Sequence, residues 1–430
     1  MTTREAIRRY DAICTLGLEQ VLADELTALG LTVTARRHGA VGFEADREMA
    51  YKACFWLRSA VRVREFLISG RAESRDELYR LVGSVDWSAM MTVTNTLAVD
   101  SSVDDPRVNH SNLPTLVVKD AIVDSLRRRS GSRPDVDREN PDIPVFLSLR
   151  DGEAALYRDL GGASLHKRGY RDIESKSPLN EALAAGLLLR IGFNAERYPV
   201  VVDPFCGSGT FLMEAAWMAT DTAPGIMRTF AFERFRDRDA TAISRIRNEA
   251  NRRRRIDCPV RFYGSDHHPG ALWIARHSAT MASVQPYVRF EEVDICNYVP
   301  PEQPSLVVTN PPWGLRMEEG PGLDAAWRGL GGFLRRHAKG ADAWVLSGAP
   351  GVTRHLGLEA SERLPIKAGP IDCRFLHYVM RERADTAPPQ ADTAALYQTA
   401  QPVLNETVPQ TVEWNDGATP LESSEPSESE

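Results

Sequence analysis

The sequence predicts an α/β protein whose largest domain has a Rossmann-like, mostly parallel sheet. Short β-branched runs at residues 200–202 and 306–308 each stop at turn residues, which is typical of buried parallel strands. The first run leads into the glycine turn CGSGT at 206–210, and a helix is expected to begin near Phe211. The second leads into NPPW at 310–313. Open α/β sheets bind nucleotide-like ligands where such turns follow the strands.

Composition limits the classes of protein to consider. A chain of 430 residues is expected to form two or three compact units, and 43% hydrophobic residues are enough for ordinary cores. The chain has no apolar run of about 18 residues and no apolar secretion signal, so no membrane span is expected. Its six cysteines are scattered without a Cys-x-x-Cys pair, which argues against zinc and disulfides and predicts reduced thiols in a cytoplasmic protein.

The net charge of −7 is unevenly distributed. From Arg381 onward there are ten acidic and two basic residues, so the rest of the chain carries 50 basic and 49 acidic residues. This tail, residues 381–430, is rich in Pro, Ser, Thr, Glu and Gln and is expected to be disordered. Basic clusters at 127–129, 166–171 and 252–255 could follow RNA phosphates, with a solvated helix face as the alternative.

Residues 1–70 are expected to form a small α+β module without a catalytic constellation. Hydrophobic periodicity predicts helices at 18–29 and 51–61 and strands at 31–35 and 40–45.

Residues 71–165 are expected to form a second non-catalytic α+β module. Its expected elements are helices at 78–85 and 116–129 and strands at 96–102, 144–150 and 153–160. The last two strands should form a hairpin because Asp151-Gly152 between them is a strong turn dipeptide.

Residues 166–197 are expected to link these modules to the main domain, residues 198–380. Ser177-Pro178 is typical of an N-cap followed by a first helical residue, and an apolar helix face follows at 183–191.

Acidic residues end the next two expected strands of the main domain. The Asp266 carboxylate could accept hydrogen bonds from ribose hydroxyls, and Asp294 could take an adenine amino group beside Ile295. A loop-capping role is the alternative for both aspartates. His267 and His268 are adjacent and point apart, so no metal site is expected.

The remaining elements fit a seven-stranded, mostly parallel sheet. They are a helix at 323–337, a fifth strand at 343–347 and two strands within 364–380. The connection at 221–257 is longer than one βα unit needs, and we expect either an RNA-contacting insertion or a plain surface helix there.

The NPPW segment carries the most specific chemistry. Pro311 and Pro312 remove two backbone donors and stiffen the loop. The Asn310 side chain and the Pro311 carbonyl can accept the two hydrogens of an exocyclic amine, while Trp313 can stack on a base. A proline turn with a buried Trp is the alternative.

DPFCGSGT at 203–210, taken with NPPW, resembles the class I S-adenosylmethionine-dependent methyltransferases that modify exocyclic amino nitrogens. The stretches 118–143, LHKRGYR at 165–171 and GPIDCRF at 369–375 resemble the bacterial large-subunit (23S) ribosomal RNA guanine-N2 methyltransferases that carry a THUMP domain with a ferredoxin-like companion. The resemblance covers residues 11–380.

This resemblance implies a ferredoxin-like domain at 1–70, a THUMP RNA-binding domain at 71–165, a class I methyltransferase domain at 198–380, S-adenosylmethionine as cofactor and RNA as partner. The residues implied to bind the cofactor are Asp203, Pro204, Cys206, Gly207, Gly209, Thr210, Asp266, His267, Asp294, Ile295, Ser177 and Pro178. Those implied to bind RNA are Lys119, Arg127, Arg128, His166, Lys167, Arg168 and Arg171.

The chain departs from the resembled family in three places. Trp313 stands where relatives usually have Tyr, so stacking is kept and a phenol hydroxyl is lost. Asn180 stands where relatives usually have Lys, which would weaken a contact to the cofactor carboxylate. Many relatives continue into a second methyltransferase domain, so a single modification is expected.

Direct methyl transfer to guanine N2 is the mechanism that these features favour, with positioning and electrostatics supplying the catalysis. A transfer-RNA guanine-N2 or adenine-N6 enzyme is the nearest alternative, because NPPW serves both bases. A non-catalytic RNA-binding or assembly factor is the alternative from another class. A nicotinamide dehydrogenase is disfavoured because the third glycine of its fingerprint is missing after Gly209.

Overall fold

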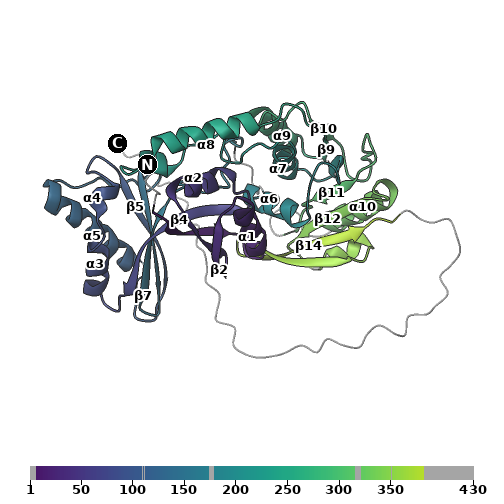
Figure 1. The fold of residues 1–430 in the computed structure, drawn as a ribbon. Helices are drawn as coiled ribbons and strands as arrows, with labels where there is room; N and C mark the ends of the chain where they lie inside the picture. The colour runs from purple at the N-terminus through teal and green to yellow at the C-terminus, as the bar shows by residue number, and fades with distance from the viewer. Residues whose placement is uncertain are drawn as a thin grey trace, which may run out of the picture. The chain divides into compact units, whose positions relative to one another are not determined.

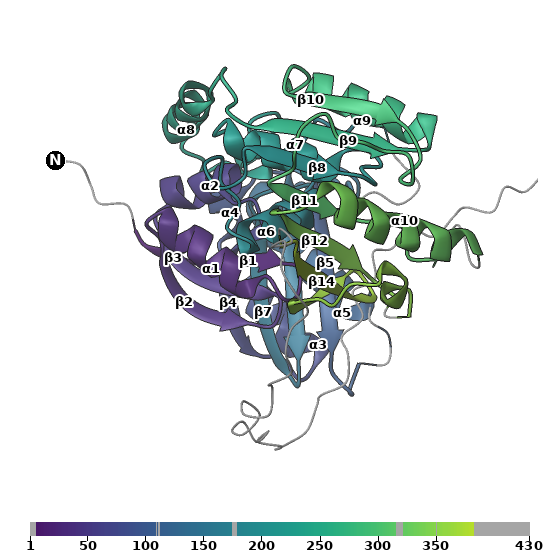
Figure 2. The ribbon, with the colours of Figure 1, turned by 90° about the vertical axis from the view of Figure 1, so that its right-hand side faces the viewer.

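The fold was analysed in a computed structural model that describes residues 6–108, 110, 112–173, 179–314, 321–349 and 351–381. Within these residues the chain forms two seven-stranded sheets with helices packed against them (Figures 1 and 2). The expected α/β fold is therefore confirmed. The predicted tail lies outside the described residues from position 382 onward.

The first sheet combines both N-terminal modules. Its strands, in spatial order, are β2 (Thr32–Arg37), β3 (Ala40–Ala45), β1 (Arg8–Cys14), β4 (Ala60–Arg71), β7 (Glu153–Asp159), β6 (Ile143–Arg150) and β5 (Leu97–Asp104). β4 pairs antiparallel with β7, from Arg64 opposite Asp159 to Arg71 opposite Glu153. The two predicted modules thus share one continuous sheet.

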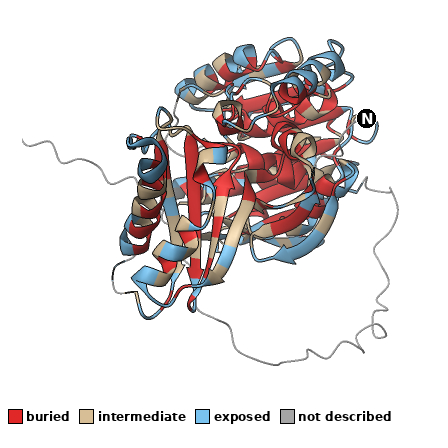
Figure 3. Ribbon diagram, turned by 60° about the vertical axis from the view of Figure 1, so that its left-hand side comes forward, coloured by how far each residue is buried: buried red, intermediate tan, exposed pale blue. Residues whose placement is uncertain are grey.

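Five helices accompany this sheet among the described residues: α1 (Glu19–Ala28), α2 (Arg47–Trp56), α3 (Arg75–Gly83), α4 (Trp87–Met90) and α5 (Asn112–Ser130). Their buried residues join one hydrophobic cluster with alternate strand residues such as Tyr10, Ala12 and Leu147. Figure 3 shows buried residues along the strands of this half and exposed residues on the outer faces of its helices.

The helix predicted at 51–61 begins and ends earlier than expected. Asp46 caps α2 by accepting from the Met49 amide at 2.8 Å, and the helix stops at Trp56. The buried Glu25 carboxylate then accepts from the amides of Arg58 and Ser59, at 2.7 and 2.9 Å. A carboxylate from another helix therefore fixes the bend into β4.

The predicted hairpin is confirmed. Asp151 and Gly152 join β6 to β7 with φ of 48° and 79°, the left-handed conformation that two-residue hairpin turns require.

The second sheet has the expected mixed topology. Its strands, in spatial order, are β10 (Val288–Glu292), β9 (Arg261–Asp266), β8 (Val200–Asp203), β11 (Leu306–Thr309), β12 (Asp342–Ser347), β14 (Ile371–Val379) and β13 (Glu362–Ala368). The first five are parallel to one another, and β14 is antiparallel to both of its neighbours. The chain order reverses between β8 and β11, which is where open α/β sheets bind ligands.

Helices of this half are α6 (Glu181–Arg190), α7 (Thr210–Ala219), α8 (Ala240–Arg253), α9 (Pro269–Met281) and α10 (Pro321–His337), with short 3₁₀ turns η1 (Ala231–Arg234) and η2 (Thr353–Leu356). α8 lies beside α2 of the first half (Figures 1 and 2). Arg245 pairs with Glu48 at 2.5 Å, and the Arg253 guanidinium lies 3.9 Å from the centre of the Trp56 ring. The long connection is thus a helix whose arginines contact the first half.

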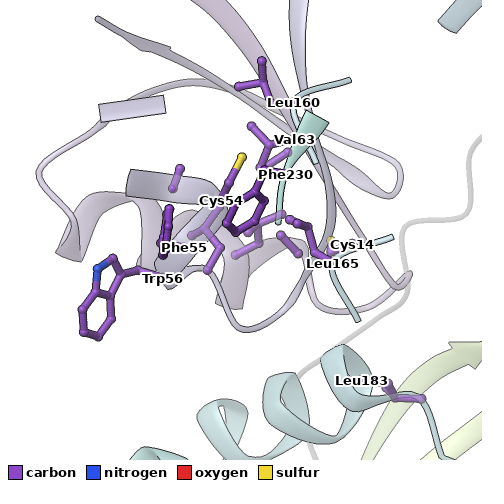
Figure 4. Close-up of a cluster of buried hydrophobic side chains, with 14 of the residues drawn as sticks. Cys14, Cys54, Phe55, Trp56, Val63, Leu160, Leu165, Leu183 and Phe230 are labelled. Atoms are coloured by element: carbon purple, nitrogen blue, oxygen red, sulfur yellow. The ribbon is translucent and has the colours of Figure 1, made fainter. Parts of the chain in front are cut away.

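The residues before α8 join the two halves through a buried connection. Figure 4 shows Phe230 among Cys54, Phe55 and Val63 of the first half, and the rings of Phe55 and Phe230 are 4.7 Å apart. Asp237 accepts from the buried Arg158 of β7 at 2.7 Å. This connection fixes the second half against the first sheet.

Candidate active site

The glycine turn follows the central strand β8 directly. The Cys206 amide donates to the carbonyl of Ser265 at 2.9 Å, which ties the turn to β9. Gly207 and Gly209 have φ of 52° and 80°, a conformation that favours glycine. A Cβ on Gly209 would meet Met213 and Phe290, whereas one on Gly207 would meet open space. Gly209 therefore serves packing, and Gly207 leaves room for a ligand.

Asp266, at the end of β9, holds this turn in place. Its carboxylate accepts from the Gly207 amide at 3.0 Å and from the His268 amide at 2.9 Å. Each oxygen keeps a second lone pair for a ligand hydroxyl. His267 is exposed beside it, and His268 caps α9 through its side chain. Among the described residues no group of three or more His, Cys, Asp or Glu could hold a metal ion.

Asp294 and Ile295 follow the neighbouring strand β10. Asp294 is exposed and accepts from the Cys296 amide at 2.8 Å, so one carboxylate oxygen caps its own loop. Ile295 is 5% exposed and packs against α10, where a Cβ on Gly329 would approach within 2.8 Å. Asp294 can therefore cap its loop and also contact a ligand, because its second carboxylate oxygen is left for the ligand.

Asn310 follows β11, the strand next to β8. Its Oδ1 atom is buried and has no hydrogen-bond partner among the described residues. The following prolines are held by α10, since the Trp327 indole donates to the Pro312 carbonyl at 2.9 Å. A buried acceptor without a partner is costly, so it indicates a site that a donor from a ligand completes.

Trp313 is half-buried and anchored to the neighbouring strand. Its indole donates to the Leu346 carbonyl at 3.2 Å, and a Cβ on Gly348 would lie 2.5 Å from its ring. Part of the ring therefore packs against the chain just after β12. Sequence reasoning did not foresee this anchor, since nothing near Trp313 in the sequence indicates Leu346.

Asp203 lies beneath the site rather than open to it. It is 2% exposed, and its carboxylate accepts from the Thr309 hydroxyl at 2.6 Å and the Phe205 amide at 3.2 Å. Burial raises the pKa of Asp203 to about 7. Cys206 is also buried, and burial raises the pKa of its thiol well above the usual value, as a packing role requires.

Pro204, Thr210, Ser177 and Pro178 complete the predicted cofactor residues. Pro204 and Thr210 are buried within the turn and at the start of α7. Ser177 and Pro178 lie outside the described residues. Nearby, Asn180 caps α6 by accepting from the Leu183 amide at 3.0 Å.

Two of the predicted RNA-binding arginines do not face solvent. Arg168 is 2% exposed and pairs with the fully buried Glu214 of α7 at 3.3 Å, so its guanidinium is not open to an RNA phosphate, contrary to what the resemblance implied. Arg171 pairs with Glu181 at 3.0 Å and donates to the Thr210 hydroxyl. It supports the glycine turn instead of a phosphate.

The other predicted RNA-binding residues differ in exposure. His166 is half-buried, bonds Ser164 at 2.7 Å, and its pKa is lowered to about 4 by burial, so the ring is neutral near pH 7. Lys167 is exposed. On α5, Arg127 and Arg128 are exposed in the last turn, and Lys119 is half-buried beside Asp120.

Three family models match the chain in sequence order. They are the RlmL ferredoxin-like domain at residues 10–64, the THUMP domain at 72–159 and the RMKL-like methyltransferase domain at 168–377. No helix among the described residues is long and apolar enough to cross a membrane.

Curated relatives match most of this chain. A protein of Syntrophotalea carbinolica named ribosomal RNA large subunit methyltransferase K/L is 38% identical over 87% of this chain and 54% of its own length. A protein of Chromohalobacter salexigens with the same name is 37% identical over 84% of this chain and 51% of its own length. The chain thus spans about half the length of the curated relatives it matches.

Solved structures match over about nine tenths of this chain. A possible methylase from Clostridium difficile 630 is 28% identical with a TM-score of 0.78, covering 90% of this chain and all of its own. SMU.472, a candidate methyltransferase complexed with SAH, is 25% identical with a TM-score of 0.79, covering 89% of this chain and all of its own.

Proposed function

Because this chain belongs to the THUMP-domain family of RMKL-like methyltransferases, we propose that it transfers a methyl group from S-adenosylmethionine to the exocyclic N2 of a guanine in large-subunit (23S) ribosomal RNA. The names of the curated relatives support the RNA class. Action on ribosomal RNA would take place in the cytoplasm.

The buried Oδ1 of Asn310 is the observation that carries the proposal. It is an acceptor without a partner among the described residues, and it lies beyond the end of β11. β11 pairs with β8 through Leu306 opposite Val201, so the strands deliver Asn310 and the glycine turn to one edge of the sheet. An incoming amine would supply the missing donor.

The cofactor fits the residues beside this acceptor. Open space next to Gly207 would accommodate it, and the free lone pairs of Asp266 would accept from ribose hydroxyls. Asp294 would accept from the adenine amino group, with Ile295 against the ring. When bound, S-adenosylmethionine supplies an electrophilic methyl group on sulfur.

The chain's own contribution to the reaction is to hold the target nitrogen. The lone pair of an exocyclic amine is delocalised into the ring, so this nitrogen is a poor nucleophile. Asn310 Oδ1 and the Pro311 carbonyl would accept hydrogen bonds from the two N–H groups of the amine and so favour a pyramidal nitrogen. The exposed part of the Trp313 ring would stack on the base and fix the orientation of its plane. No covalent intermediate with the protein is needed.

RNA docking is assigned to the THUMP region. Arg127 and Arg128 extend from the end of α5 into solvent, where guanidinium groups can contact phosphates. Lys119 on the same helix and Lys167 would add charge, although Lys119 is already beside Asp120.

The test is to delete the gene and digest ribosomal and transfer RNA to nucleosides for mass spectrometry. We expect one N2-methylguanosine to disappear from large-subunit RNA and to return when purified protein and methyl donor are added. Loss of the nucleoside from transfer RNA, or of N6-methyladenosine instead, would reassign the substrate. Unchanged nucleosides with no transfer in vitro would support a non-catalytic assembly factor.

A further inference from the structure

We propose that the methyltransferase domain has its own site for the RNA backbone. This site is a cleft beside the catalytic loop, residues 310–313, and it binds phosphates next to the target nucleotide. This edge cleft, of about 380 Å³, is rimmed by Arg354, Arg363 and Arg374 and has Leu376 and Tyr378 in its floor. The inference rests on the proposed function, because it assigns a second contact surface for the same RNA.

Strand pairing places the cleft near Asn310. Arg374 of β14 lies opposite Ser347, the last residue of β12, and opposite Pro365 of β13 on its other side. β12 is parallel to β11, so Ser347 at the end of β12 and Asn310 just after β11 lie at the same edge of the sheet. Ser347 itself lines the cleft.

The catalytic loop touches the chain that forms the wall of the cleft. The Trp313 indole donates to the Leu346 carbonyl, and its ring lies against Gly348. These two residues flank Ser347. A nucleotide held over Asn310 would therefore have its neighbouring phosphates near the cleft.

The three arginines are available for an anion. Each is exposed, and none is recorded in an ion pair with a carboxylate in the part of the chain that the structure describes. Arg354 Nε donates to the His355 ring at 3.3 Å. Arg158 and Arg168, in contrast, are buried and paired with carboxylates. Exposed guanidinium groups without a carboxylate partner are suited to phosphate oxygens.

Two carboxylates also line the cleft, so its three arginines leave it with a net charge of +1. Asp372 lies opposite Lys367 in the β13–β14 ladder, so a lysine is its cross-strand neighbour. Glu359 also lines the cleft and is exposed. The cleft thus keeps a net positive rim.

The floor suits a nucleotide chain. Leu376 and Tyr378 are 4% and 3% exposed and form part of the second hydrophobic cluster. An apolar floor under a basic rim can contact ribose and base edges while the guanidinium groups contact phosphates. The segment GPIDCRF, at 369–375, supplies Arg374 and Asp372 and thereby acquires a role.

The experiment compares RNA binding by the wild type and by the triple variant Arg354→Ala/Arg363→Ala/Arg374→Ala. The probe is a labelled RNA fragment of the large subunit that the wild-type protein methylates, titrated at several salt concentrations. Removal of three phosphate contacts should reduce the slope of log affinity against log salt by about 2, since each contact contributes about 0.7 with single-stranded RNA. Affinity at low salt should fall at least about tenfold.

A single variant, Arg374→Ala, is compared with the matched control variant Arg289→Ala. Arg289 is an exposed strand arginine of the same sheet, but it lies on β10 at the opposite edge. We expect Arg374→Ala to raise KM for RNA, with kcat at saturating RNA and affinity for the methyl donor near the wild-type values. Arg289→Ala should leave all three quantities unchanged. Melting temperatures of both variants check that they are folded.

The outcomes separate this inference from the proposed function. Wild-type protein that transfers no methyl group to RNA would overturn the proposed function. An active wild type whose triple variant keeps the full salt slope, or loses no more affinity than Arg289→Ala, would overturn the edge cleft alone. Restoration of the slope by Arg→Lys at the three positions would support a phosphate contact, because charge is kept.

Discussion

The Thr309 hydroxyl donates a 2.6 Å hydrogen bond to the buried Asp203 carboxylate and joins the ends of the parallel strands β11 and β8. One of these residues precedes the glycine turn, and the other precedes Asn310. The bond therefore fixes the two halves of the site against each other. Both residues are buried, so water is excluded from the bond and the low local dielectric strengthens it.

Replacing Asp203 by Asn should flatten the dependence of stability on pH. Burial raises the pKa of Asp203 from 3.8 to about 7. Between these values the folded protein holds a proton that the unfolded chain releases, so stability is greatest at low pH and is lost as pH rises through about 7. Thermal unfolding of both proteins from about pH 5 to pH 8 measures the difference. Equal slopes would show that this carboxyl does not titrate in that window.

Asn310→Ala should abolish methyl transfer without reducing stability. Its Oδ1 has no partner among the described residues, so truncation removes an unsatisfied buried acceptor. We expect transfer to fall at least about 100-fold and donor affinity to change less than about twofold. Asn194→Ala is the control, since Asn194 accepts from the Arg197 amide at 2.9 Å in a distant turn. Asn194→Ala should reduce stability and keep activity. If Asn310→Ala instead lowers stability and donor affinity together with activity, Asn310 has a structural role.

Gly207→Ala should weaken methyl-donor binding more than its effect on stability explains. Both Gly207 and Gly30 have positive φ and open space where a Cβ would lie. Alanine should therefore cost about 1 kcal/mol of unfolding free energy at either position. Only Gly207→Ala places a methyl group in the proposed cofactor space. Calorimetric titration with the donor distinguishes them, and equal affinity in both variants would remove Gly207 from the site.

Asp237→Ala should loosen the connection between the two halves. Asp237 accepts from the buried Arg158 at 2.7 Å and pairs with Arg47 at 3.3 Å. Arg158 keeps Glu65, so we expect a loss of about 2 kcal/mol in urea unfolding, less than for an isolated buried charge. Asp221→Ala breaks the more exposed pair with Arg253 and should cost less than about 1 kcal/mol. Similar losses in the two variants would contradict a structural role for the connection.

Local sequence alone predicted the elements of the main sheet and the residues that lie at its edge. The strands that precede the glycine turn and NPPW, and the strand that ends at Asp266, lie where they were predicted. Each is defined by neighbouring residues in the sequence. The hairpin at Asp151-Gly152 is confirmed for the same reason. Their roles toward the cofactor and the base remain predictions.

Tertiary structure decided which basic residues are free and how the N-terminal modules combine. Arg168 is buried and paired with Glu214, whereas Arg374 is exposed at the edge cleft. The single sheet at β4–β7, the anchor of Trp313 on Leu346 and the Thr309–Asp203 bond likewise join residues far apart in the chain. Burial and pairing depend on partners that only the folded chain brings together, so no local pattern could determine them.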